Sequence, residues 1–264
     1  MDVPVLSPAR RALERRRLAW ALLYLPWSAG VFLPVAVGSM LGLGSLAVLV
    51  SLVSPDAAWW VGVSWSRLVC WANLTRVELR GVEHCRPGQS YVYMLNHNSN
   101  FDVVAFYGSW RSPFRWVLKE ELRKIPGLGW YCAAGGHVFL DRSNHERAVA
   151  SLAHARERMA REGFSIAFFP EGTRSRLGRL QPFKKGGFVL AQELGLPILP
   201  ISVSGSNAVL PGKTLRLLPG RIVLTVHPEL DTRAYGEDRE RLMADTRAAI
   251  AGGLSPWEQG DSEP

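Results

Sequence analysis

Hydrophobic and polar positions divide the chain into two parts. From Leu18 to Pro55 the sequence contains 38 consecutive residues without a charged side chain. A bilayer core about 30 Å thick is crossed by about 20 helical residues, so this run is longer than one perpendicular span requires. After residue 74, short apolar runs alternate with longer amphipathic stretches. The pattern predicts a basic, membrane-anchoring helical region over residues 1–74 and a separate domain over 75–252.

Pro26, Pro34 and the glycines from Gly38 to Gly44 interrupt the uncharged run. Three arrangements remain open: one long kinked or tilted helix, a re-entrant hairpin, or two short spans. The run is too long for the apolar part of a cleaved signal peptide. Residues 57–71, which are rich in Trp and carry one charge, Arg67, predict a helix at the membrane interface, with a buried helix pair as the alternative.

The rest of the chain alternates between strand-like and helix-like patterns. Strands are expected at 75–80, 91–95, 114–118, 137–140, 165–169 and 197–203, and helices at 102–110, 144–162, 187–194 and 237–251. Residues 215–218 and 221–226 are expected to form a hairpin, and residues 253–264 a disordered tail. This alternation predicts an α/β domain with a mixed, largely parallel sheet flanked by helices.

A histidine and an aspartate follow the apolar run at 91–95. His97 leaves the end of this expected strand, and Asp102 lies five residues later, where a helix is expected to begin. A hydrogen bond from the imidazole to the carboxylate would fix the tautomer and leave the other ring nitrogen free to accept a proton. A short pattern of this kind is also found where the two side chains merely cap a turn.

Two later segments, 136–142 and 169–175, also follow strands, where ligand-binding loops of α/β folds lie. With the lysines after them, they supply Arg142, Arg174, Lys184 and Lys185 close to glycines. Guanidinium groups bind phosphate bidentately, and lysine adds a point charge. The sequence therefore supplies a general base and a group of cations, the predicted cradle, that could hold a phosphorylated ligand. Each cation alone is also consistent with a solvent-exposed surface residue, and Glu171 could pair with Arg174.

Composition narrows the class of partner. The net charge of +8 and the pI near 9.8 favour an anionic partner. Six of the ten Trp precede residue 75, away from the basic loops, which favours a membrane over nucleic acid. Cys70, Cys85 and Cys132 are too widely spaced for a disulfide framework or a zinc site, and the histidines lack metal-ligand spacing.

Four segments in this order resemble the conserved blocks of the glycerolipid acyltransferases of the HxxxxD type, above all the bacterial 1-acyl-sn-glycerol-3-phosphate acyltransferases. Asn96-His97 with Asp102 matches the first block, Gly136 to Arg142 resembles the second, Phe169 to Ser175 matches the third in full, and Leu196 to Ile201 resembles the fourth. The resemblance extends from about Arg67 to about Val203.

The resemblance implies that His97 is the general base and that Asp102 orients it. It implies acceptor-binding roles for Arg142, Glu171, Gly172, Thr173, Arg174 and Lys184. The acceptor hydroxyl would attack the thioester of acyl-CoA or acyl-ACP (acyl carrier protein), without a covalent acyl-enzyme, a metal or another cofactor. The expected product is phosphatidic acid, formed in phospholipid biosynthesis from lysophosphatidate.

Two alternative functions are consistent with part of these observations. The acceptor could be glycerol-3-phosphate, another lysophospholipid or a lyso-amino lipid, although the intact run from Glu171 to Arg174 and the small size favour lysophosphatidate. A different class is a non-catalytic, membrane-anchored binder of anionic lipid. The arginines from Arg10 to Arg17 place that end in the cytoplasm by the positive-inside rule. We therefore expect the inner (cytoplasmic) membrane, with the catalytic domain facing the cytoplasm.

Overall fold

The computed structural model describes residues 8–141, 145–175, 177–212 and 214–260. Its centre is a seven-stranded sheet with the order β1-β7-β6-β2-β5-β3-β4. The strands are β1 (Thr75–Arg80), β2 (Val92–Leu95), β3 (Phe114–Lys119), β4 (Val138–Leu140), β5 (Ser165–Phe168), β6 (Ile198–Ser204) and β7 (Gly220–Val226). Every neighbouring pair is parallel except β6 and β7. The predicted mixed, largely parallel α/β fold is therefore confirmed.

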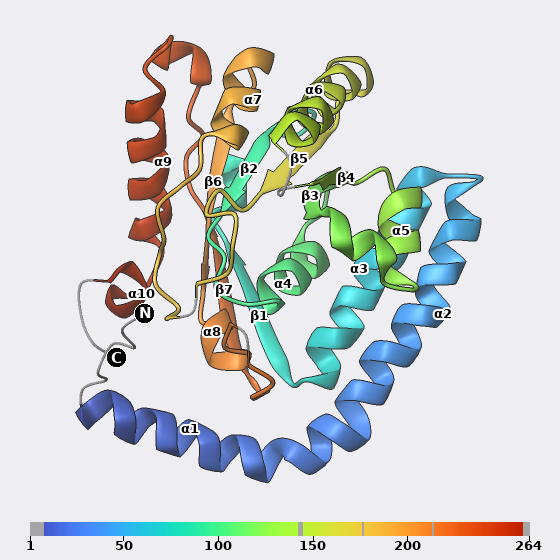
Figure 1. The fold of residues 1–264 in the computed structure, drawn as a ribbon, viewed down its shortest axis with the longest axis vertical. Coiled ribbons are helices and arrows are strands. Elements are labelled where there is room, and N and C mark those ends of the chain that lie inside the picture. Colours follow the sequence, from blue (N-terminus) through green and yellow to red (C-terminus); the bar gives the residue numbers. More distant parts are fainter. Residues whose placement is uncertain (1–7, 142–144, 176, 213, 261–264) are drawn as a thin grey trace.

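Helices cover both faces of this sheet (Figure 1). They are α3 (Pro55–Ala72), α4 (Phe101–Ser109), α5 (Leu128–Ala134), α6 (His145–Glu162), α7 (Gly186–Leu194), α8 (Ser206–Val209) and α9 (Arg239–Gly252), with short 3-10 turns at Val82–His84, Glu120–Lys124 and Thr232–Tyr235. One core, which includes Trp59, Phe106 and Phe114, lies against α3 and α4. The other, which includes Ile166, Phe188 and Leu242, lies against α6, α7 and α9.

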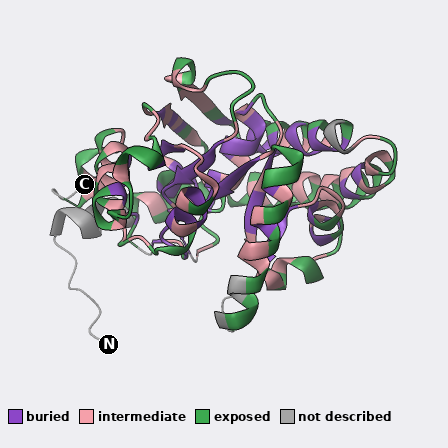
Figure 2. Ribbon diagram, turned by 90° about the horizontal axis from the view of Figure 1, so that it is seen from above, coloured by how far each residue is buried: buried purple, intermediate pink, exposed green. Residues whose placement is uncertain are grey.

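Burial explains the strand sequences. Every residue of β2 and β5 is buried, as is every residue of β6 but the last, which is why these strands read as continuous apolar runs. Strand β7 instead alternates between buried and half-exposed positions. Buried residues accordingly gather in the strands and in the helix faces that pack on them (Figure 2).

The uncharged N-terminal run forms one long bent helix. Helix α1 (Pro8–Trp27) continues through a π-helical turn at Ser28–Phe32 into α2 (Leu33–Ser51). The π turn lies just before Pro34, which has no N–H to donate to the preceding turn, and such a site is where a long helix bends. By length and composition, residues Arg15–Ser51 form the one helix in the described chain that could cross a membrane.

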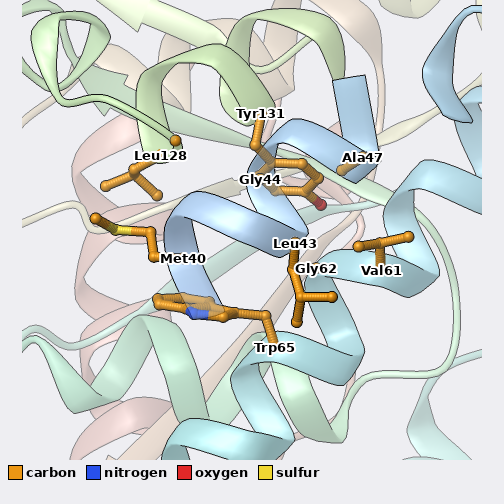
Figure 3. A pocket seen from close by; sticks show the side chains of 10 residues that line it. Met40, Leu43, Gly44, Ala47, Val61, Gly62, Trp65, Leu128 and Tyr131 are labelled. Carbon is orange, nitrogen blue, oxygen red and sulfur yellow. The ribbon is translucent and has the colours of Figure 1, made fainter. Parts of the chain in front are cut away.

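After α2 the chain reverses its direction, and α3 packs along α2. Gly44 of α2 lies so close to Gly127, before α5, that a Cβ at Gly44 would sit 2.7 Å from the Gly127 carbonyl oxygen. Beside this contact, α2, α3 and α5 enclose a small apolar cavity of about 20 Å³ (Figure 3). That volume holds about one water molecule, so the cavity is a packing gap with no room for a substrate.

Helix α3 is partly a core helix. Its inner face buries Trp59, Val63 and Val69, whereas Trp60 and Trp71 are 47% and 69% exposed. The alternative of a buried helix pair thus describes one face of α3. The outer face keeps the aromatic character expected of a membrane interface, and its position there stays a prediction.

Two sequence-based expectations are wrong. Residues 215–218 form no strand with β7, because β7 fills the gap between β6 and β1 and pairs with both. The expected disordered tail is ordered over residues 253–260, and residues 261–264 lie outside the described chain. Pro256–Gln259 form helix α10, whose buried Glu258 accepts a hydrogen bond from the Gly205 N–H at 2.9 Å and another from the Ser204 hydroxyl.

Candidate active site

The expected histidine–aspartate pair forms at the C-terminal end of β2. The Nδ1 atom of His97 lies 2.8 Å from the Oδ2 atom of Asp102, in the first turn of α4. The same oxygen accepts hydrogen bonds from the N–H groups of Asn98 at 2.7 Å and Ser99 at 2.8 Å. Asp102 is fully buried and the His97 side chain is 16% exposed. With Nδ1 donating to the carboxylate, the network assigns Nε2 as the atom free to accept a proton.

Asn96 holds the loop that carries His97. Its side chain donates to the Val203 carbonyl at 2.9 Å and accepts from the Val203 N–H at 2.7 Å. This amide continues the pairing of β2 with β6 after the strand itself has ended. The Ser99 hydroxyl adds a hydrogen bond to the Leu210 carbonyl at 2.7 Å. Asn96 belongs to the first block, but its bracing role depends on a residue 107 positions away and has no local signal in the sequence.

Glu171 links the third block to the first. One carboxylate oxygen accepts from the backbone N–H of His97 at 2.6 Å, and the other accepts from the backbone N–H and the side-chain amide of Gln181, both at 3.0 Å. Burial raises the pKa of Glu171 to about 7, and the charge of Asp102 acts in the same direction. The structure thus places this predicted acceptor-binding residue behind the loop that carries His97, together with Gln181, which the sequence did not single out.

An aromatic stack holds the imidazole ring. His97 stacks on Phe169 with ring centroids 3.9 Å apart, and Phe169 stacks on Trp116 at 5.1 Å. Below them, the backbone N–H of Trp116 donates to Nδ1 of His137 at 2.9 Å. Burial, with two nearby arginines, lowers the pKa of His137 to about 3, so this ring is neutral and structural. Aromatic residues after β5 and on β3 were the only sequence signal for the stack.

The predicted cradle lies on the loop after β5. Gly172 has a φ of +72°, and a Cβ there would lie 2.9 Å from Cδ of Lys184, so the lysine stem runs directly against the glycine. The Lys184 N–H donates to the Pro170 carbonyl at 2.7 Å. Thr173 is exposed and Arg174 is half-buried. Arg142 lies outside the described residues.

This arrangement supplies the groups that acyl transfer to a hydroxyl needs. The Nε2 atom of His97 can accept the hydroxyl proton while Asp102 stabilises the imidazolium that forms. Arg174 and Lys184 provide positive charge on the neighbouring loop, as a phosphate group requires. The Cβ of any other residue at Gly172 would collide with the lysine stem.

The chain is similar to known acyltransferases. The acyltransferase family profile matches residues 76–204. A 1-acyl-sn-glycerol-3-phosphate acyltransferase of Chlamydomonas reinhardtii is 30% identical over 238 residues, which are 89% of this chain and 70% of that protein. The enzyme of the same name from Escherichia coli (strain K12) is 32% identical over 201 residues, 76% of this chain and 81% of that protein.

Longer relatives are covered less fully, and this chain spans 53% of the chloroplast protein of Brassica napus. Among solved structures, the 1-acyl-sn-glycerophosphate (LPA) acyltransferase PlsC of Thermotoga maritima matches with a TM-score of 0.76 and 26% identity. That match covers 90% of this chain and 95% of the other. The shared fold, the matched residues and the placement of His97 and Asp102 lead to one conclusion: this chain belongs to the 1-acyl-sn-glycerol-3-phosphate acyltransferase family.

Proposed function

We propose that the protein transfers a fatty acyl group from a thioester to the free hydroxyl of 1-acyl-sn-glycerol-3-phosphate, which gives phosphatidic acid. The observation that carries this proposal is the hydrogen-bonded pair of His97 and Asp102 beside the loop of Glu171 to Arg174. The activity for which the similar proteins are named supports the choice of acceptor. The donor is acyl-CoA or acyl-ACP, and no cofactor is required.

The reaction follows from the position of the imidazole. Nε2 of His97 takes the proton of the acceptor hydroxyl as its oxygen bonds to the thioester carbonyl carbon. The tetrahedral intermediate then collapses, the carbon–sulfur bond breaks, and the leaving thiolate takes the proton back from the imidazolium. Asp102 stabilises that cation and keeps the ring in one tautomer. The acyl group thus moves directly from sulfur to oxygen.

The acceptor phosphate is proposed to bind Arg174 and Lys184, with Arg142 as a third cation. Thr173 offers a hydroxyl beside them, and Gly172 keeps the backbone accessible. Glu171, buried and already occupied by three N–H donors, is better suited to positioning His97 than to contacting substrate. We therefore revise its proposed role from binding to positioning.

We also propose that α1, α2 and the outer face of α3 hold the site at the cytoplasmic side of the inner membrane. Large apolar side chains are exposed along these helices, among them Trp20, Leu23, Leu49 and Trp60. An apolar surface of this extent suits lipid better than water. It would leave the lipid tails of acceptor and product in the bilayer while the phosphate reaches the basic loop.

The test is acyl transfer by purified His97→Ala and Asp102→Asn proteins. The control is His154→Ala, which removes an exposed histidine of α6. Lysophosphatidate, glycerol-3-phosphate, another lysophospholipid and a lyso-amino lipid are each offered with both donors. We expect transfer to lysophosphatidate, loss of at least about a hundredfold in both variants, and full activity in the control. Transfer to a different acceptor alone would replace lysophosphatidate, and unchanged activity in both dyad variants would overturn the roles of His97 and Asp102. A wild-type protein that transfers to none of the acceptors would leave only a lipid-binding role.

A further inference from the structure

A cavity of about 580 Å³ opens between α6 and α7, at the ends of β3, β4 and β5. Figure 1 shows these two helices side by side, across the sheet from α3 and α4. The cavity floor consists of apolar side chains from both helices and the three strands: Val117, Leu140, Leu152, Phe168, Val189 and Leu190. Its volume lies within the range of about 300–1,000 Å³ that is typical of small-molecule sites.

The rim of this cavity is basic. Lys184 and Lys185 are exposed at the start of α7, and Arg156 of α6 also lines the cavity. Among the described residues of the lining, Glu193 is the one that is acidic, and Arg156 pairs with it at 3.0 Å. Glu193 therefore does not occupy either lysine, and Lys185, which has no role in acceptor binding, is available to a second ligand. An apolar floor below a cationic rim suits an elongated, weakly polar molecule that carries a phosphate.

The cavity also borders the loop that follows β5. Phe169, Pro170 and Gly172 belong to its lining. Phe169 is the residue whose ring stacks on His97 at 3.9 Å. A ligand that fills the cavity thus ends at the edge of β5, next to the residue that supports the general base. His97 itself is not among the lining residues, and Phe169 is the residue that connects the cavity to the imidazole.

A thioester donor extends in two directions from its reacting carbonyl carbon. The acyl chain is apolar and belongs on the side of α2 and α3, whose exposed side chains suit lipid. In the other direction lies the carrier arm, which must extend from the site toward water. Both carrier types present the same arm, a phosphopantetheine, which is a largely neutral chain of two amides that ends in a phosphate. This chemistry matches the apolar floor and the lysine rim of the cavity.

We propose that the cavity between α6 and α7 binds the phosphopantetheine arm of the acyl donor, with Lys185 at the phosphate of the arm. This inference rests on the proposed acyl transfer. It places the lipid tails of the substrates on the anchor side and the carrier arm on the side of α6 and α7. Lys184, at the edge of the cavity, is left to the acceptor phosphate, and Lys185 to the phosphate of the arm. It also makes the site common to acyl-CoA and acyl-ACP.

The first test fills the cavity. Ala153 of α6 lines it, and Ala160 of the same helix is exposed and outside it. In Ala153→Trp we expect the KM for both donors to rise at least about tenfold, which corresponds to about 1.4 kcal/mol, with the KM for lysophosphatidate unchanged. Ala160→Trp should change neither. A rise in the acceptor KM, or in the KM of one donor only, would overturn the assignment.

The second test isolates the phosphate. Lys185→Ala should raise the KM of an acyl-phosphopantetheine several-fold and leave that of an acyl-pantetheine, which lacks the phosphate, unchanged. Equal effects on both would refute the role of Lys185. Calorimetric binding of unreactive thioether analogues of both arms gives the same comparison without turnover. A wild-type protein that binds these analogues but transfers nothing would contradict the proposed function and not the arm site.

Discussion

Replacement of Glu171 by Gln tests the link between the two conserved loops. The carboxylate accepts three N–H groups, one from His97 at 2.6 Å and two from Gln181 at 3.0 Å. A glutamine has one acceptor oxygen, so its NH2 group would face a backbone N–H on one side. An orphaned buried donor costs about 1–3 kcal/mol. If this free-energy cost is expressed as a displacement of His97 from its catalytic position, we expect kcat to drop roughly tenfold to a hundredfold.

The pH dependence of stability gives an independent measure. The pKa of Glu171 is about 7 in the folded protein, against a usual 4.5, because burial disfavours the charged form. The folded state therefore holds this proton more tightly than the unfolded state. The resulting stabilisation is fully present below pH 4.5 and is lost as the pH rises through 7. The whole effect is about 3 kcal/mol, of which about 2.5 kcal/mol falls between pH 5 and pH 8.

The assay is urea unfolding of wild type and Glu171→Gln in detergent from pH 5 to pH 8. The wild type should lose about 2.5 kcal/mol relative to the variant over this range. Glu157→Gln, at an exposed position of α6, should follow the wild type throughout. Curves for wild type and Glu171→Gln that stay parallel would refute the reasoning about a buried, titrating carboxyl. An unchanged kcat would show that His97 keeps its place without this bond.

Three further changes test other parts of the fold. Asn96→Leu leaves the N–H and carbonyl of Val203 unpaired and should lower the free energy of unfolding by about 2 kcal/mol or more; a stable variant would contradict the bracing role. Gly44→Val places a side chain against the Gly127 carbonyl and should cost about 1–3 kcal/mol, seen as a lower Tm, whereas Gly42→Val, with open space around it, should not. Glu258→Ala removes the acceptor for Gly205 and should make the tail more sensitive to proteolysis, with unchanged cleavage as the contrary result.

The sequence predicted features that depend on neighbours along the chain. His97 and Asp102 are five residues apart, so a strand followed by a helix is enough to bring them together. Contacts between residues that are far apart in the sequence could not be predicted in this way. Glu171 meets His97 across 74 residues, and Asn96 meets Val203 across 107. No local pattern records such pairs.

The two wrong expectations, on the hairpin and on the tail, also concern contacts between residues that are far apart in the sequence. The alternation in Gly220–Val226 correctly indicated a strand, but its partners are set by the sheet order and not by the adjacent turn. Likewise, the polar composition of the tail suggested disorder, whereas the acceptor that fixes it, Glu258, binds the distant Gly205. The aromatic residues of α3 could not reveal which would enter the core, because that depends on the position of α4.

The position of β2 explains how one histidine can serve two substrates. It is the central strand, with three others on either side, and His97 leaves its C-terminal end. The acceptor is proposed to approach from the side of α3 and the donor arm from the side of α6. Trp60→Ala, on the exposed face of α3, should therefore raise the acceptor KM, and Ala153→Trp the donor KM. Distant changes without shared partners add within about 0.5 kcal/mol, so the double variant should show the product of the two effects in kcat/KM. A coupling well above that value would mean that both changes act on the same binding site.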